Sequence, residues 1–107
     1  MLNRRYIPAI TIASIIIIVL WKLVFTNLIL ARGDTLYYIY PYWEHRARTF
    51  LSGQMPLWNP YIFMGSPFLA NPQAGVLYPP NWLLTPFNTT NAVKIAIITH
   101  LWIAAFG

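Results

Sequence analysis

Residues 7–25 read IPAITIASIIIIVLWKLVF, and this stretch decides the fold class. Only Thr11, Ser14 and Lys22 interrupt it with polar side chains. As a single helix it would be about 28 Å long, which matches the roughly 30 Å hydrocarbon core of a bilayer. The stretch therefore predicts a membrane-spanning helix near the start of the chain.

A cleaved signal peptide is the competing interpretation, because Arg4 and Arg5 precede the apolar stretch. Signal peptides have a hydrophobic region of about 7–15 residues that ends in small residues at a cleavage site. The stretch here is longer and lacks an Ala-x-Ala end, so it is interpreted as a retained span. The two arginines favour a cytoplasmic N-terminus by the positive-inside rule.

The composition points to the same class of protein. Of 107 residues, 58% are hydrophobic and 8% are charged, whereas soluble domains average about 25% charged residues. The high hydrophobicity excludes intrinsic disorder. The net charge of +5 comes from scattered basic residues that form no long run or stripe, which excludes nucleic acid as a partner. The absence of cysteine excludes disulfides, thiolate metal sites and a cysteine nucleophile.

The composition changes over residues 32–90, which hold eight of the nine prolines. No apolar run in this segment is long enough to cross a bilayer. It nevertheless contains Trp43, Trp58 and Trp82, and such aromatic side chains favour the headgroup level of a membrane. We expect a structured first extracytoplasmic loop over this segment, lying at the membrane surface.

Within this loop, residues 41–52 have the spacing of an amphipathic helix. Pro41 suits its first turn, and Gly53 suits the position after its end. We expect a short interfacial helix. Its predicted apolar face consists of Trp43, Ala47, Phe50 and Leu51.

The last segment opens with the helix-start residues Asn88–Asn91 and continues through the apolar stretch Ala92–Phe106. That stretch would span about 22 Å as a helix, short of a bilayer. Residues 91–107 are therefore interpreted as the start of a truncated second transmembrane helix, and residues 1–31 as a cytoplasmic N-terminus with the first span. The sequence predicts an all-α membrane protein, the N-terminal fragment of a multi-pass helical bundle.

Asp34 directly follows the first predicted span and is one of two acidic residues. A carboxylate at a membrane surface can accept a proton from a hydroxyl group or hold a divalent cation; the alternative is a helix cap. Glu44, the other acid, would lie about 15 Å away on one continuous helix, too far to share a site. A fold-back at Pro41, which disfavours a helical Tyr40, would bring the two acids together.

Four further residues are candidates for substrate binding alongside Glu44. Arg46 and Arg48 could hold the phosphate of a lipid or a lipid-linked substrate, but they lie on different helix faces, and snorkelling to headgroups is the alternative. Asn59 and Gln73 are amides among aromatic residues, a combination that suits sugar hydroxyls. Turn stabilisation is the alternative for both amides.

Neither histidine has the spacing of a metal site. His100 falls in the second predicted span, where it is interpreted as a hydrogen-bond partner between helices. The stretch Asn88-Thr89-Thr90 matches a glycosylation acceptor, and helix capping explains it equally well.

Several motifs follow one another along the chain: Gly33-Asp34, Tyr40-Pro41, GQMPLWNPY at 53–61, GSP at 65–67, Gln73 and YPPN at 78–81. Together they resemble the start of the bacterial YfhO-type membrane proteins, which are similar to the GT-C class of polytopic glycosyltransferases. The resemblance covers residues 1–107. It implies a bundle of transmembrane helices in the plasma membrane, with a long first extracytoplasmic loop.

The resemblance also implies an activity, the transfer of a sugar from a polyprenyl-phosphate carrier to an extracytoplasmic acceptor. Asp34 matches the early loop acid that serves this class as base or metal ligand, so it is the implied catalytic residue of an inverting transfer. The implied cofactor is a divalent cation, Mg or Mn. The expected partners are membrane lipid, the polyprenyl-phosphate-linked sugar and the remaining transmembrane helices of the parent chain. The alternatives are a non-catalytic lipid-binding or flippase component and an inactive truncated fragment.

Overall fold

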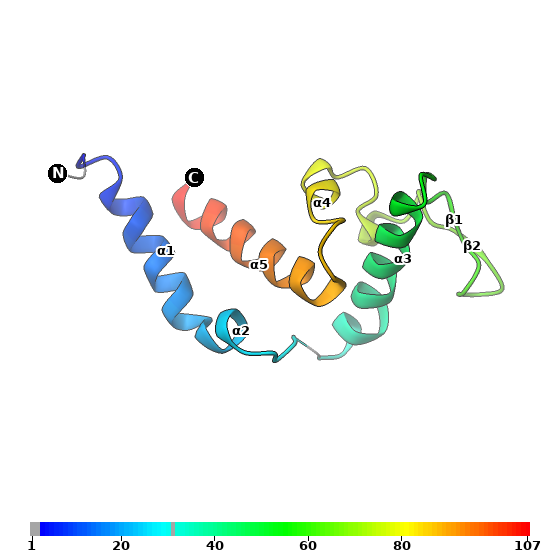
Figure 1. The fold of residues 1–107 in the computed structure, drawn as a ribbon, viewed down its shortest axis with the longest axis horizontal. Helices are drawn as coiled ribbons and strands as arrows, with labels where there is room; N and C mark the ends of the chain where they lie inside the picture. The colour runs from blue at the N-terminus through cyan, green and yellow to red at the C-terminus, as the bar shows by residue number, and fades with distance from the viewer. Residues whose placement is uncertain (1–2, 31) are drawn as a thin grey trace. The chain divides into compact units, whose positions relative to one another are not determined.

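The computed structural model describes residues 3–30 and 32–107, and it is mostly helical (Figure 1). The sequence predicted an all-α protein, and the described residues differ from this by one small two-stranded sheet. The chain forms two compact units. Unit 1 contains the residues up to Ile29 together with Lys94–Gly107, and unit 2 is Leu30–Val93. Ala31, where the first predicted segment ends, lies outside the described residues.

The apolar stretch of unit 1 forms two helices instead of the predicted single one. Helix α1 is Ile7–Val19 and helix α2 is Trp21–Phe25. They meet at Leu20, whose backbone angles of φ −100° and ψ 21° leave the helical region. Helix α1 alone is therefore about 20 Å long.

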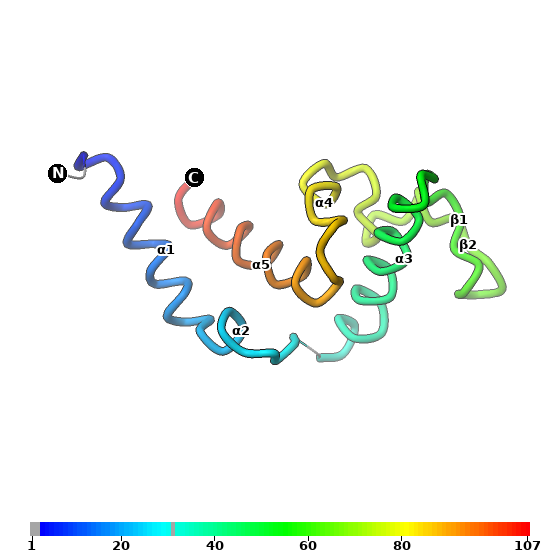
Figure 2. Tube along the Cα trace, in the orientation of Figure 1, coloured from blue at the N-terminus to red at the C-terminus, as the bar shows by residue number. Residues whose placement is uncertain are grey.

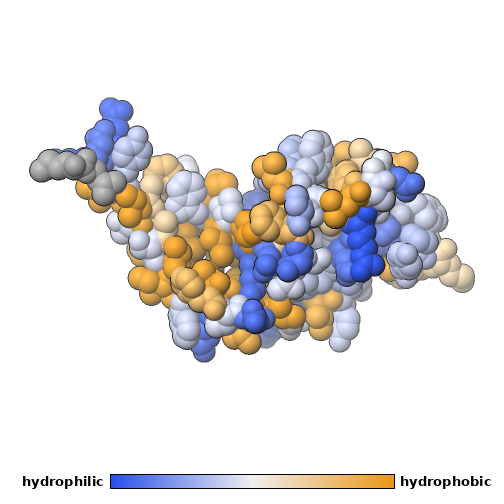
Figure 3. Space-filling model, in the orientation of Figure 1, coloured by the Kyte–Doolittle hydropathy of each residue, from blue (hydrophilic) through white to orange (hydrophobic). Residues whose placement is uncertain are grey.

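Polar side chains in α1 are bonded within the helix itself. The hydroxyl groups of Thr11 and Ser14 donate to the carbonyl oxygens of Ile7 and Ile10, each at 2.8 Å. No side chain of α1 is buried by the rest of the chain, and hydrophobic residues dominate the surface over this helix (Figure 3). The helix therefore presents an apolar surface whose few hydroxyl donors are already paired.

Helix α5, Thr89–Phe106, runs antiparallel to α1 where it belongs to unit 1 (Figures 1 and 2). Trp102 Nε1 donates to the Ala9 carbonyl oxygen at 3.3 Å. At the other end of the pair, Lys94 Nζ donates to the Thr26 carbonyl oxygen at 2.8 Å. Among the described residues, α5 is the one helix that is long and apolar enough to cross a membrane.

The start of α5 lies where the sequence predicted it. Asn88 Oδ1 accepts a hydrogen bond from the Asn91 backbone N–H at 2.9 Å, which satisfies one of the free donors of the first helical turn. The capping interpretation of Asn88 is therefore confirmed.

Unit 2 begins with the π-helix η1, Thr35–Ile39, which continues into α3, Tyr40–Leu51. The helix predicted over residues 41–52 is thus confirmed to within one residue at each end. Pro41 has no N–H, and a proline inside an α-helix clashes with the preceding turn. The wider π turn accommodates it, with the Tyr40 N–H bonded to the Thr35 carbonyl. The chain therefore does not fold back at Pro41.

The remainder of unit 2 consists of short elements packed on α3. Strands β1, Trp58–Asn59, and β2, Ser66–Pro67, pair antiparallel. They are followed by the 3-10 helix η2, Pro72–Ala74, and helix α4, Pro79–Leu83. The buried core of the unit is formed by Tyr42, Phe68, Ala74 and Val76.

Side chains bond the three consecutive carbonyl groups of segment 74–76. This buried segment belongs to no sheet, so its carbonyl groups need donors from elsewhere. Each receives one from a different side chain: Arg46 Nη1 to Ala74 at 2.7 Å, Asn81 Nδ2 to Gly75 at 2.9 Å and Trp82 Nε1 to Val76 at 2.7 Å. Segment 74–76 is thereby fixed against α3 and α4.

Replacing Gly75 by alanine tests how tightly this segment is held. Gly75 has φ +59°, and an added Cβ would lie 2.5 Å from Asn81 Nδ2. Gly33 is the matched control, because it has φ +51° and an added Cβ would meet nothing within 4 Å. We expect Gly33→Ala to lower the free energy of unfolding by about 1 kcal/mol through backbone strain alone. We expect Gly75→Ala to lower it by about 2–4 kcal/mol, because steric overlap is added.

Denaturant unfolding of the purified chain, followed by tryptophan fluorescence, measures both values. Equal losses for the two variants would contradict a tightly held segment 74–76.

Candidate ligand-binding groove

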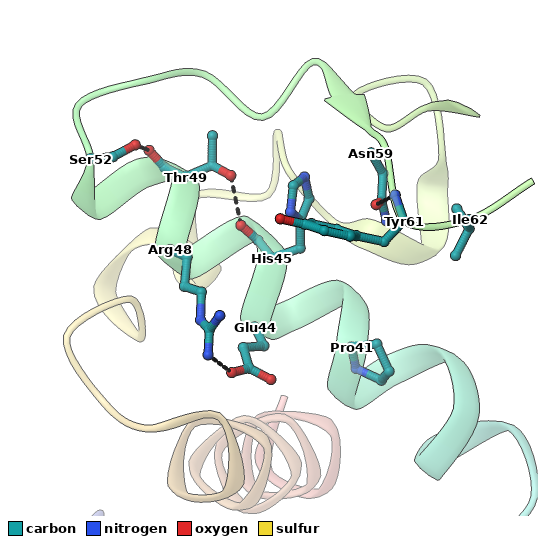
Figure 4. A pocket seen from close by; sticks show the side chains of 9 residues that line it. All are labelled: Pro41, Glu44, His45, Arg48, Thr49, Ser52, Asn59, Tyr61 and Ile62. Atoms are coloured by element: carbon teal, nitrogen blue, oxygen red, sulfur yellow. Dashed lines mark hydrogen bonds and ion pairs between the residues drawn. The ribbon is translucent and has the colours of Figure 1, made fainter. Parts of the chain in front are cut away.

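A groove of about 500 Å³ lies between α3 and the β1 hairpin in unit 2 (Figure 4). One wall is a single face of α3, and the other is β1 with the turn that follows it. The lining residues are Pro41, Glu44, His45, Arg48, Thr49, Ser52, Asn59, Tyr61 and Ile62.

His45 connects the two walls. Its Nε2 lies 3.1 Å from the Trp58 carbonyl oxygen, and because a carbonyl only accepts, Nε2 carries the proton. The ring also makes edge-to-face contacts with Phe68, at a centroid distance of 4.9 Å, and with Tyr61, at 5.8 Å. His45 therefore sets the spacing of the groove.

Tyr61 gives the groove an aromatic surface. Its side chain is 83% exposed, and its ring lies across His45 (Figure 4). The backbone is fixed by Asn59, whose Oδ1 accepts from the Tyr61 N–H at 3.0 Å. Asn59 is only 3% exposed. Its hydrogen bond stabilises the turn, which agrees with the alternative interpretation of this amide. Asn59 also lines the groove.

The α3 wall is polar. Glu44 and Arg48 form an ion pair at 2.5 Å, with both side chains at least half exposed. The hydroxyl groups of Thr49 and Ser52 donate to backbone carbonyls of the same helix, at 2.8 Å and 2.7 Å, which leaves their oxygen lone pairs available as acceptors. An acid, a guanidinium and two hydroxyls therefore lie beside one aromatic ring.

Arg46 lies outside the groove, on the opposite face of α3 from Arg48. It is 2% exposed, and its guanidinium stacks 4.4 Å from the Trp43 ring while bonding to Ala74. Burial lowers the pKa of Arg46 to about 10, so the side chain stays charged at neutral pH. The predicted apolar face of this helix is wrong at Leu51, which is 68% exposed, and it omits Tyr42 and Arg46, the two buried residues of α3.

Asp34 and Gln73 also lie outside the groove. Asp34 occupies the N-cap position of η1, is exposed, and makes no capping hydrogen bond. Because η1 and α3 are continuous, Asp34 and Glu44 do not approach each other. Gln73 is exposed on η2, where its N–H donates to Asn71 Oδ1 at 3.0 Å.

The described residues contain no group of three or more His, Cys, Asp or Glu side chains that could hold a metal ion. Asp34 alone would supply one protein ligand, whereas divalent cations take several oxygen ligands. The described residues therefore do not fit a protein-built site for Mg or Mn.

Several groove residues, among them Thr49, Ser52 and Tyr61, and one buried lysine were not singled out from the sequence. Thr49 and Ser52 follow His45 at helical spacing, so the α3 wall could have been recognised as one polar face. Lys94 is 8% exposed and bonds to Thr26. Its sequence position could have marked it, because an ionisable residue in an apolar helix is unusual. His100 Nδ1 lies 2.7 Å from the Ala96 carbonyl oxygen of its own helix.

Exchanging arginine for lysine at two positions of α3 separates the roles of its two arginines. Arg46→Lys loses the planar stack on Trp43 and the directed bond to Ala74, so we expect the free energy of unfolding to fall by about 1–3 kcal/mol. Arg48→Lys is the matched control on the exposed face, and its change should stay within about 0.5 kcal/mol. Denaturant titration measures both, and equal effects would contradict a structural role for Arg46.

Comparison with known proteins assigns no role to these residues. The chain matches no family model, no curated protein and no solved structure. The chemistry of the groove and of the apolar helices is therefore the basis for a functional assignment.

Proposed function

We propose that this chain is the N-terminal part of an integral membrane glycosyltransferase of the GT-C type, and that the groove of unit 2 binds a sugar of its substrate. One observation carries the proposal. Glu44, Arg48 and Asn59, which the sequence had marked as substrate-binding candidates, line one groove together with the exposed ring of Tyr61.

The groove suits a sugar in size and chemistry. Its volume of about 500 Å³ is within the range of small-molecule sites. The apolar face of a pyranose ring can lie on Tyr61, while the sugar hydroxyls bond to Glu44, Arg48 and the hydroxyl groups of α3. Arg48 can equally hold a phosphate oxygen of the carrier.

The helices of unit 1 support a membrane setting. Helix α5 has the length and hydropathy of a membrane span. The hydroxyl groups of Thr11 and Ser14 are bonded within α1, as an environment without water requires. We place residues 32–90 on the extracytoplasmic side of the plasma membrane, with the N-terminus in the cytoplasm.

Asp34 is the base in the proposed reaction. Its exposed carboxylate is not engaged in helix capping, so it can accept the proton of an acceptor hydroxyl. The hydroxyl oxygen then attacks the anomeric carbon, and the bond to the carrier phosphate breaks with inversion, the phosphate leaving with the electron pair. Asp34 lies about 15 Å from Glu44 along the helical stretch. The groove therefore holds a sugar unit beyond the one that reacts.

A non-catalytic sugar-binding or lipid-binding membrane protein is the second candidate. Asp34 lies outside the groove, so the groove can bind a ligand whether or not the protein transfers a sugar. This position of Asp34 favours the non-catalytic candidate. Transfer assays and binding assays distinguish the two candidates.

Replacing Asp34 by asparagine tests the transfer reaction. With membranes that contain the protein and a radiolabelled polyprenyl-phosphate sugar, we expect Asp34→Asn to lower kcat by about 10²–10⁴-fold, because the general base is lost. Glu44→Gln should instead raise KM with little change in kcat, because it removes a binding contact. Full transfer by Asp34→Asn would refute the catalytic role. Absence of transfer by the unaltered protein, with sugar binding retained, would favour the second candidate.

Replacing Tyr61 by alanine tests sugar binding directly. Loss of the aromatic surface should weaken the affinity for a sugar phosphate by about 3- to 10-fold, as measured by calorimetric titration, whereas Tyr61→Phe should retain it. Tyr37→Ala is the control, because Tyr37 is 73% exposed and lies outside the groove. Equal affinities of Tyr61→Ala and Tyr37→Ala would argue against the groove as the sugar site.

A further inference from the structure

The turn between β1 and β2 presents the most exposed apolar side chains of unit 2. We call Phe63 and Met64 the hairpin tip. Phe63 is 83% exposed and Met64 is 101% exposed, so neither contributes to the buried core. In Figure 3 the outer end of the hairpin carries hydrophobic colouring.

The tip is held in one strained conformation. Phe63 and Met64 have φ +48° and +57°, a left-handed conformation that suits glycine or asparagine and is unfavourable for bulky residues. The turn is closed by the Gly65 N–H, which donates to the Ile62 carbonyl at 2.8 Å. The Trp58 ring packs so closely on Gly65 that an added Cβ would lie 2.5 Å from it.

The fold itself therefore gains nothing from large apolar side chains at the tip. An observed backbone outlier of this kind is a reason to look for a role outside the fold. A partner that receives Phe63 and Met64 would supply that role.

The charge pattern indicates the chemistry of the partner. No Asp, Glu, Lys or Arg occurs between Arg48 and Lys94, although such residues make up about a quarter of a soluble domain. An uncharged surface complements an uncharged, apolar medium, in which charged side chains are costly. Trp58 and Tyr61 flank the tip and are more than half exposed, and these residue types favour the membrane interface.

We propose that the hairpin tip inserts between lipids at the boundary of headgroups and acyl chains. The inference rests on the proposed membrane function, because unit 2 leads directly into α5, the candidate span. Phe63 and Met64 enter the lipid, while Tyr61 stays at headgroup level with its ring in the groove. The groove then opens at the lipid surface, where a polyprenyl-linked substrate is held.

The absence of cysteine in the chain allows a direct test with single spin labels. Met64→Cys reports on the tip, and Gln54→Cys is the control at an exposed polar site of the same unit. Leu101→Cys on α5 is the reference for membrane insertion. The labelled chains are reconstituted in vesicles of phosphatidylcholine and phosphatidylglycerol, and collision rates are measured with oxygen, which enters lipid, and with a nickel chelate, which stays in water.

We expect the ratio of oxygen to nickel collisions to be higher at positions 64 and 101 than at position 54. A low ratio at 64 with a high ratio at 101 would overturn tip insertion while leaving the membrane function intact. Low rates with both reagents at 64 would mean that protein covers the tip, and this would also overturn it. A low ratio at 101 would refute the membrane function itself. Phe63→Cys gives a second readout of the tip should Met64→Cys fail to fold.

Discussion

The buried guanidinium of Arg46 is the interaction on which unit 2 depends. It stacks on Trp43 and bonds to the first carbonyl of segment 74–76, so its charge is met by an aromatic face and a backbone dipole. Removing such a donor leaves a buried carbonyl unpaired, which is costly. Because α3 carries Arg46 on its inner face and the groove residues on its outer face, the same contact that fixes the loops also positions the groove wall.

The bonding of side-chain donors to backbone carbonyls recurs throughout the chain. A protein with few carboxylates has few of them to pair with side-chain donors, so backbone carbonyl groups accept in their place. The resulting pairs link distant segments. These pairs are Arg46 with Ala74, His45 with Trp58, Lys94 with Thr26 and Trp102 with Ala9.

Local patterns predicted the helices of this fold better than its contacts. The helix at residues 41–52 and the helix start at Asn88 follow from spacing and capping, which depend on neighbouring residues alone. The break at Leu20 has no proline or glycine to mark it. The two-residue strands are too short to show an alternating pattern. The burial of Arg46 depends on its hydrogen bond to the carbonyl of Ala74, a distant residue that local patterns around Arg46 do not indicate.

The sequence marked Glu44 and Arg48 on the α3 wall of the groove and Asn59 on the hairpin wall, but it did not mark Tyr61. Tyr61 faces His45 only because β1 pairs with β2, and that pairing leaves little trace in so short a sequence. The sequence likewise left open whether Asp34 could reach Glu44. The answer depends on the backbone conformation of the single helical turn that contains Pro41.

The π turn at η1 also has a mechanical consequence. A proline that broke the helix would have made a hinge, and residues on either side could then move independently. Because η1 passes into α3 without interruption, Asp34 and the groove wall belong to one continuous helical stretch. Any rigid-body shift of that stretch would therefore carry Asp34 and the groove wall together.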